Sequence, residues 1–313
     1  MPRPFDTPGY ALLLALQQRI HAFTLDMAAE NGRDGEPLHH PLWTSDYNRL
    51  CIAPLRGGLH VEYFGEIYGE PLEWTLECLA QQPVADGISS LSFDGPDEGA
   101  NGTREWEFTA LLDSPVTFPR LRTLSIRPTR PEDHNHSLIQ RAGSIMEEGG
   151  EIARFAAKCP VLSELTVPNA PDASFFDVAL PHLTSLQIGG GYDTQGFIAH
   201  FAASSNLPAL TLLDFTECTE LQFTWADQRE TGAVTSYETY EAFFKSAAAE
   251  TLRVLRLRNT ALSAEQLQAL QALRPGLQFM VIQAAQGGYV SHFAKNVFPW
   301  RHLVPGDTGL TKG

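Results

Sequence analysis

The chain has 313 residues, 43% of them hydrophobic, and carries 22 Lys and Arg against 37 Asp and Glu, a formal net charge of −15. This length allows one large domain or two ordinary ones, and the apolar fraction is enough for a continuous core. So acidic a surface repels phosphate backbones and anionic lipid, which argues against nucleic-acid and membrane partners and favours a basic protein partner.

The first predicted element is an amphipathic helix near the N-terminus. Apolar residues recur there at helical spacing, namely Leu12, Leu13, Leu16, Ile20 and Phe23, and Thr7 and Pro8 suit a cap and a first turn. The apolar run at residues 11–16 is too short to span a bilayer and lacks the flanking features of a secretory signal. We therefore expect a cytoplasmic protein.

Residues 1–68 do not share the pattern of the rest of the chain. After the helix, residues 47–53 and 59–64 are predicted strands, joined by the hairpin-like segment at residues 54–58. We interpret residues 1–68 as an N-terminal cap made of a helix and a β-hairpin.

Neither the cysteines nor the histidines indicate a metal site or cofactor. The cysteines are widely separated without a Cys-x-x-Cys pair, and we interpret them as reduced, small hydrophobic residues: Cys51, Cys78, Cys159 and Cys218. His134 and His136, beside Glu132 and Asp133, are interpreted as residues of a solvated loop.

A phrase Leu-x-x-Leu-x-(Leu/Ile/Phe/Val) recurs through residues 69–286. Its copies begin at Ile88, Leu121, Leu162, Leu183, Leu210, Leu252 and Leu277. Each phrase predicts a strand, and a helix is predicted before each copy except the one at Leu183, at residues 71–82, 105–113, 151–159, 194–205, 237–250 and 263–273. Since helices separate consecutive strands, the strands are expected to pair in parallel.

Three of the six gaps between copies, of 21, 27 and 25 residues, fall within the ~20–29 residues typical of one leucine-rich repeat. Two gaps, of 41 and 42 residues, predict polar insertions near residues 127–149 and 217–236. Residues 287–313 are predicted to form a C-terminal cap whose aromatic residues cover the last repeat.

The repeated phrase resembles that of leucine-rich-repeat proteins of the ribonuclease-inhibitor-like class. The layout is similar to that of bacterial cytoplasmic leucine-rich-repeat proteins of unassigned function. The resemblance implies an α/β solenoid, shaped as a horseshoe or arc, with a parallel sheet on the concave face and helices on the convex face. The turn position where the family often has Asn or Cys departs from the pattern, because only Cys218 matches it.

The resemblance also implies interaction through the concave face. By strand alternation, small hydroxylated residues line the first half of this face, Arg256 and Arg258 lie near its end, and Phe279 and Val281 point outward in the last copy. We predict a non-catalytic protein-protein interaction module, binding a partner that is basic overall or presents an acidic segment to Arg256 and Arg258. The predicted polar contacts are Arg127, Glu164, Asp214, Arg256 and Arg258.

Three alternatives stay open. The chain could be an immunity-type or inhibitor-type protein that neutralises a basic toxin or enzyme, an array that binds through its convex helices, or an enzyme with a site in the two insertions. The sequence has no Gly-x-Ser-x-Gly or His-Glu-x-x-His motif. Residues 189–191, three glycines, lack a following Lys-Ser/Thr and are interpreted as a repeat turn.

Overall fold

The computed structural model describes residues 4–33, 48–55, 57–67, 69–96, 102–130, 133, 135–144, 148–191, 193–217, 235–258, 260 and 262–282. Most of the second predicted insertion and the whole predicted tail at residues 287–313 therefore lie outside the described residues, as do Glu132, His134 and Cys218.

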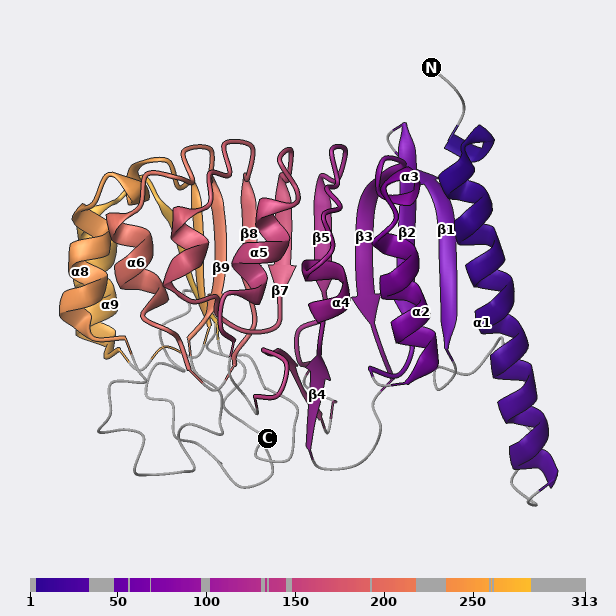
Figure 1. The fold of residues 1–313 in the computed structure, drawn as a ribbon. Coiled ribbons are helices and arrows are strands. Elements are labelled where there is room, and N and C mark those ends of the chain that lie inside the picture. The colour runs from indigo at the N-terminus through magenta and orange to yellow at the C-terminus, as the bar shows by residue number, and fades with distance from the viewer. Residues whose placement is uncertain are drawn as a thin grey trace.

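The fold is α/β and is built on one large, open, mostly parallel sheet (Figure 1). Nine strands follow one another across it in chain order: β1 (Arg49–Leu55), β2 (Gly58–Phe64), β3 (Ile88–Asp94), β5 (Thr123–Ile126), β7 (Glu164–Val167), β8 (Ser185–Ile188), β9 (Leu212–Thr216), β10 (Val254–Arg258) and β11 (Gln278–Ile282). Only β1 and β2 pair antiparallel, as the predicted hairpin requires.

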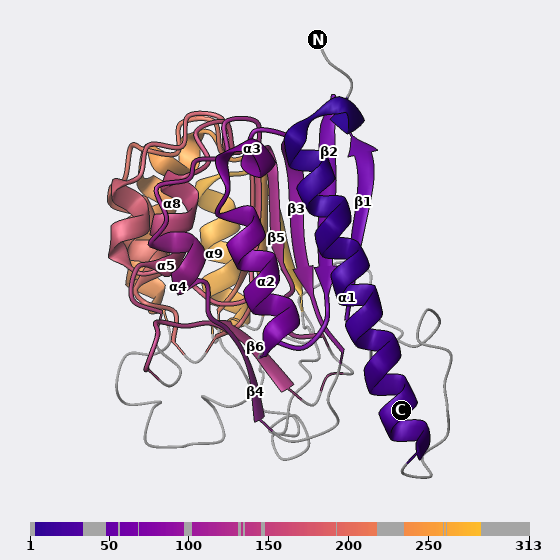
Figure 2. The same ribbon diagram turned by 45° about the vertical axis from the view of Figure 1, so that its right-hand side comes forward.

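Helices cover one face of this sheet, and in the described part of the chain the other face has no helix over it (Figure 2). The helices are α1 (Pro8–Arg33), α2 (Glu70–Leu79), α3 (Gln82–Ala85), α4 (Thr109–Leu112), α5 (Glu151–Ala157), α6 (Phe197–Ala203), α8 (Tyr237–Lys245) and α9 (Ala264–Leu273), with 3₁₀ turns η1 (Pro4–Asp6), η2 (Ala173–Asp177) and η4 (Ala248–Glu250). None of these helices has the length and apolar character needed to cross a membrane.

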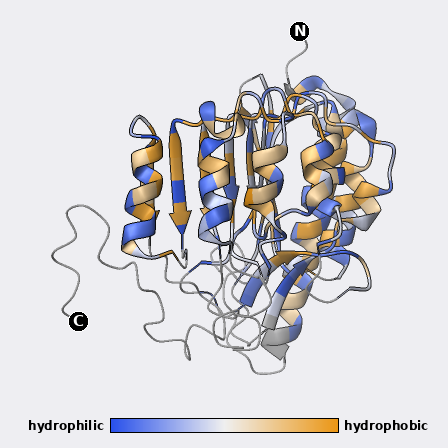
Figure 3. Ribbon diagram, turned by 90° about the vertical axis from the view of Figure 1, so that its left-hand side faces the viewer, coloured by the Kyte–Doolittle hydropathy of each residue, from blue (hydrophilic) through white to orange (hydrophobic). Residues whose placement is uncertain are grey.

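The core lies between the sheet and the helices. Two rows of apolar side chains, in register from strand to strand and at most 2% exposed, point toward the helices: Val61, Leu91, Leu124, Leu165, Leu186, Leu213 and Leu255 in one row, and Tyr63, Phe93, Ile126, Val167, Ile188, Phe215 and Leu257 in the other. Rings from the helices pack on them, such as Phe197 on Phe215 at 5.0 Å between centroids. Figure 3 shows that hydrophobic and hydrophilic residues are interspersed along the helices. The recurring phrase therefore predicted the strands and their inward positions correctly from β3 to β10.

The last strand is shifted by one residue from the predicted alignment. Phe279 lies opposite Leu255, and Met280 lies opposite Arg256. Phe279 and Val281 therefore pack against the core, whereas Met280 is 37% exposed. The prediction that Phe279 and Val281 face outward is wrong, because a one-residue shift in a strand exchanges its two faces. Packing favours the observed alignment, since the Phe279 ring lies 5.4 Å from that of Phe244 on α8.

The first insertion contributes a buried strand. Strand β6 (Asn135–Ile139) pairs in parallel with β4 (Gly102–Trp106) to form a second, two-stranded sheet. All five residues of β6 are buried, so the prediction that His136 lies in a solvated loop is wrong. Burial lowers the pKa of His136 to about 4.

The predicted helix at residues 105–113 loses its first two residues to β4. Its helical part shrinks to α4, because Trp106 is fully buried and donates from Nε1 to Ser137 Oγ at 3.0 Å. The Trp106 ring also stacks on Phe108. Pairing with β6 therefore outweighs the local helical pattern.

The N-terminal helix packs on the hairpin and on α2. Leu13, Leu16 and Ile20 belong to the common core, and Gln17 donates from its side chain to the backbone oxygen of Leu50 on β1 at 2.7 Å. The helix thus covers the first strands of the sheet.

Candidate functional site: the open face of the sheet

The candidate site is the sheet face that points away from the helices, which we call the open face. Side chains alternate along each strand, so every second residue points to it. Its central line, which we call the middle row, joins register neighbours on eight strands: Glu62, Ser92, Ser125, Thr166, Gln187, Asp214, Arg256 and Met280. Seven of these eight side chains are polar or charged, which lines this face with hydrogen-bonding groups, and four of them are short: Ser92, Ser125, Thr166 and Asp214.

Three of the five predicted site residues meet at one end of the open face. The Asp214 side chain, 3% exposed, accepts two hydrogen bonds from Arg258, from Nε at 2.6 Å and from Nη2 at 2.8 Å. Arg256 approaches the same carboxylate at 3.4 Å with Nη1 and keeps a 38% exposed side chain. The hydrogen bond to Asp214 raises the pKa of Arg258. One carboxylate thus faces two guanidinium groups, which leaves a local positive charge carried mainly by Arg256.

Arg127 lies elsewhere and is buried. It was expected to face a partner, but it is only 6% exposed, and its guanidinium forms ion pairs with Asp133 and, at 3.2 Å, with Asp94. Arg130 binds the other oxygen of Asp94 at 2.9 Å. These two arginines are therefore occupied within the chain, because the first insertion places Asp133 against them.

An open depression of about 350 Å³ lies beside this charged group. It is lined by Glu62, Ser92, Phe93, Asp94, Ser125, Arg127, Pro128, Thr129, Arg130 and Gln187. The middle row forms part of its floor, so the depression belongs to the open face.

Glu164 is partly exposed on β7, where its carboxylate lies 3.5 Å from Thr123 Oγ1. It occupies the row beside the middle row, between Thr123 and Ser185. Of the five predicted residues, only Asp214, Arg256 and Arg258 contact one another, whereas Glu164 and the buried Arg127 lie apart from them.

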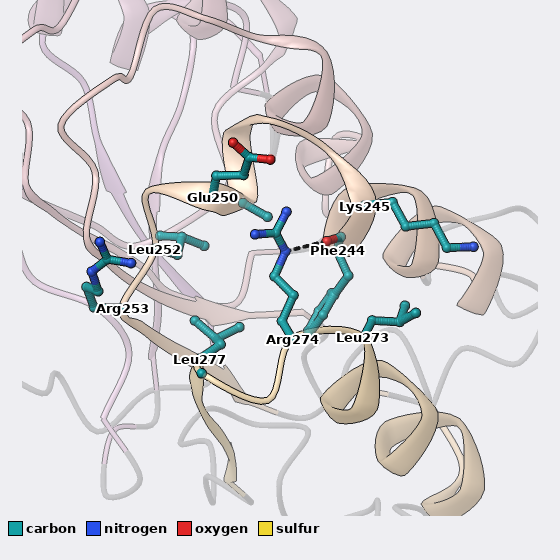
Figure 4. Close-up of a pocket in the computed structure, with 10 residues that line it drawn as sticks. Phe244, Lys245, Glu250, Leu252, Arg253, Leu273, Arg274 and Leu277 are labelled. Atoms are coloured by element: carbon teal, nitrogen blue, oxygen red, sulfur yellow. Dashed lines mark hydrogen bonds between the residues drawn. The ribbon is translucent and has the colours of Figure 1, made fainter.

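A second hollow, of about 440 Å³, lies near the end of the sheet between α8, η4 and α9 (Figure 4). Its central cation, Arg274, donates from Nε to the backbone oxygen of Phe244 at 2.5 Å and from Nη2 to that of Ser246 at 3.0 Å. Arg274 thereby binds the C-terminal end of α8, which is a structural role.

Two buried carboxylates were not predicted. Glu217 accepts from Tyr240 Oη at 2.7 Å and from the Thr235 backbone N–H at 2.7 Å, and burial raises its pKa to about 7. Glu148 accepts from the backbone N–H groups of Gly150 at 3.0 Å and Ile152 at 2.8 Å, and burial likewise raises its pKa to about 7. Because both bind backbone groups, they hold loops and helix ends in place. The sequence offers no spacing that distinguishes them from surface glutamates.

The described residues contain no group of three or more His, Cys, Asp and Glu side chains that could hold a metal ion. The arrangement on the open face offers hydrogen bonds and ion pairs along an extended surface.

The comparison with solved structures includes one distant similarity. No family model matches the sequence, and no curated protein matches it. A crystal structure of a Bacteroides fragilis protein, solved by a structural genomics consortium, aligns with a TM-score of 0.40 at 12% identity over 73% of this chain. The match covers 66% of that protein's chain, slightly less than two thirds of its length.

Proposed function

We propose that this chain is a leucine-rich-repeat solenoid that binds a protein partner on the open face of its sheet without catalysing a reaction. The observation that carries the proposal is the middle row: eight side chains, seven of them polar or charged, lie in register across eight strands on a face that no helix of the described chain covers. The repeat assignment is supported by the recurring phrase together with a strand order that follows the chain order.

The size of the face suits a macromolecule. Eight spacings of ~4.8 Å between nine strands make the sheet about 38 Å wide. A surface of this width can hold an extended segment or one side of a small folded protein. Small side chains such as Ser92 and Ser125 also allow a partner's backbone to approach the sheet closely.

The net charge of −15 supports a partner that is basic overall. A specific version of the proposal is an immunity-type or inhibitor-type protein directed at a basic toxin or enzyme. Long-range attraction of this kind accelerates association, and added salt weakens it.

The proposal is tested by placing a bulky side chain on the floor of the open face. Thr166 is partly exposed in the middle row, and Ala199 is exposed on α6 on the opposite side of the sheet. A partner captured from native lysate by wild type and by Ala199→Arg should be lost by Thr166→Arg, with circular dichroism confirming that all three proteins are folded. Retention by folded Thr166→Arg would exclude the open face, and loss by Ala199→Arg alone would favour the helices as the binding surface.

A further inference from the structure

The middle row carries opposite charges near its two ends. Glu62 on β2 has a side chain that is 35% exposed, and Arg256 on β10 has one that is 38% exposed. Between them lie four uncharged residues and the buried Asp214. Resting on the proposed function, we propose that the middle row binds an extended segment of a protein partner that places a basic side chain at Glu62 and an acidic side chain at Arg256.

Glu62 can accept a stronger ion pair than the one it has. The basic side chain paired with it in the described chain is His60, whose Nε2 lies 3.7 Å from Glu62 Oε2, beyond hydrogen-bonding distance. Arg127 and Arg130, which line the same depression, are bound to Asp94 and so do not neutralise Glu62. A lysine or arginine from a partner would therefore meet a partly exposed carboxylate.

Arg256, in turn, can bind an acidic side chain of a partner. Arg258 takes both oxygens of Asp214 at 2.6 and 2.8 Å, which leaves Arg256 a single longer contact of 3.4 Å. A guanidinium has five N–H donors in a planar fork that matches a carboxylate. A partner's aspartate or glutamate can thus bind Arg256 without displacing Arg258 from Asp214.

The separation of the two ends sets the length of the segment. Six strand spacings of ~4.8 Å separate β2 from β10, which places Glu62 and Arg256 about 29 Å apart. An extended chain advances ~3.3 Å per residue and points successive side chains to opposite sides, so the partner's basic and acidic residues should be about eight or ten positions apart.

The remaining residues of the row fit such a segment. The hydroxyl and amide groups of Ser92, Ser125, Thr166 and Gln187 can bond to its backbone. Next to Arg256, Met280 is 37% exposed and offers an apolar contact to a residue adjoining the acidic one. A polyanion such as nucleic acid would instead be repelled at the Glu62 end.

The test is a selection of random peptides about sixteen residues long, displayed on phage and captured by the full-length protein. Selected peptides should share a basic and an acidic residue about eight or ten positions apart, with an apolar residue near the acidic one. Glu62→Gln and Arg256→Gln should each weaken binding of a selected peptide by up to about fivefold, as expected for losing one partly exposed ion pair. The control Glu238→Gln, at an exposed position on α8, should leave binding unchanged.

A charge exchange sharpens the test. The double variant Glu62→Arg/Arg256→Glu should prefer peptides in which the two charges are exchanged, and the glutamine variants keep the test valid if the double variant does not fold. Selected peptides without the spaced charges, or with equal affinity for wild type and both glutamine variants, overturn this inference. If those peptides are nevertheless lost from folded Thr166→Arg, the open face still binds and only the charge assignment fails. If Thr166→Arg binds them as wild type does, the proposed function fails as well.

Discussion

Arg258 and Asp214 form a two-point ion pair across neighbouring strands, with one hydrogen bond to each carboxylate oxygen. The carboxylate is almost completely removed from solvent, whereas the guanidinium is 26% exposed. A buried carboxylate depends on such a partner, because removing the partner leaves an uncompensated charge. The pair therefore stabilises the part of the open face on which Arg256 lies.

The two arginines at Asp214 should differ in their effect on stability. Arg258→Gln removes the two-point pair and should lower the free energy of unfolding by about 2 kcal/mol. Arg256→Gln removes a single longer contact from a more exposed side chain and should cost less than ~1 kcal/mol. Urea denaturation of both variants beside wild type measures the difference, and equal losses would contradict the assigned roles.

Asn169 should hold the second sheet against the first. Its side chain accepts from the backbone N–H of Ile139 at 2.9 Å and donates to the Ile139 oxygen at 3.0 Å, and both residues are buried. Asn169→Ala would leave both backbone groups unpaired and should cost about 2–3 kcal/mol.

Hydrogen exchange followed by mass spectrometry checks this directly, since amides of β6 should exchange faster in Asn169→Ala than in wild type. Asn169→Asp keeps the acceptor and loses the donor, so it is expected to fall between the two. Unchanged protection of β6 in Asn169→Ala would show that other contacts hold this strand.

Gly189 should not tolerate a side chain. A Cβ placed there would lie 2.3 Å from the backbone oxygen of Pro168, in the preceding turn, and backbone cannot move aside cheaply. Gly189→Ala should therefore cost about 1–3 kcal/mol through overpacking. A Cβ added at Gly276 would meet nothing within 4 Å, and the φ of Gly276 is not positive, so Gly276→Ala should change stability by less than ~0.5 kcal/mol. Thermal unfolding of the two variants compares them, and a neutral Gly189→Ala would show that the turn can relax.

The sequence predicted the large sheet well because its strands repeat one phrase. Leucines such as Leu165 and Leu186 mark inward positions that alternation alone assigns. The same reasoning failed at β11, where Leu277, Met280 and Ile282 match the phrase although packing of Phe279 on Phe244 selects the other register. The local sequence pattern could not decide between two registers of β11 on β10 that differ by one residue, because each places apolar residues on the core side.

The candidate site was predicted in part, for a related reason. Alternation placed Asp214, Arg256 and Arg258 on the same face of adjacent strands, and they do contact one another. Alternation could not show that Arg127 is buried, because its partner Asp133 comes from an insertion whose path no repeat specifies. The role of Glu217 could not be predicted from the sequence either, because it depends on hydrogen bonds from Tyr240 and Thr235, which lie far from it along the chain.

Glu217 should make stability depend on pH. It is 2% exposed, and burial raises its pKa from 4.5 to about 7 despite hydrogen bonds from Tyr240, Thr260 and Thr235 that act in the opposite direction. Between pH 4.5 and 7 the folded state then binds more protons at this carboxyl than the unfolded state does. The stability that Glu217 contributes is therefore fully present below pH 4.5, is lost as the pH rises to about 7, and is constant above that.

Comparison with Glu217→Gln isolates this effect, because glutamine cannot ionise. The free energy of unfolding of wild type relative to Glu217→Gln should fall by an amount on the order of 2 kcal/mol between pH 5 and pH 8. Urea denaturation at both pH values measures it, with Glu238→Gln, exposed on α8, as the control that should show no such change. A difference between wild type and Glu217→Gln that stays constant across this range would mean that the carboxyl is already ionised at pH 5. In that case the hydrogen bonds to Glu217 would outweigh the cost of burial.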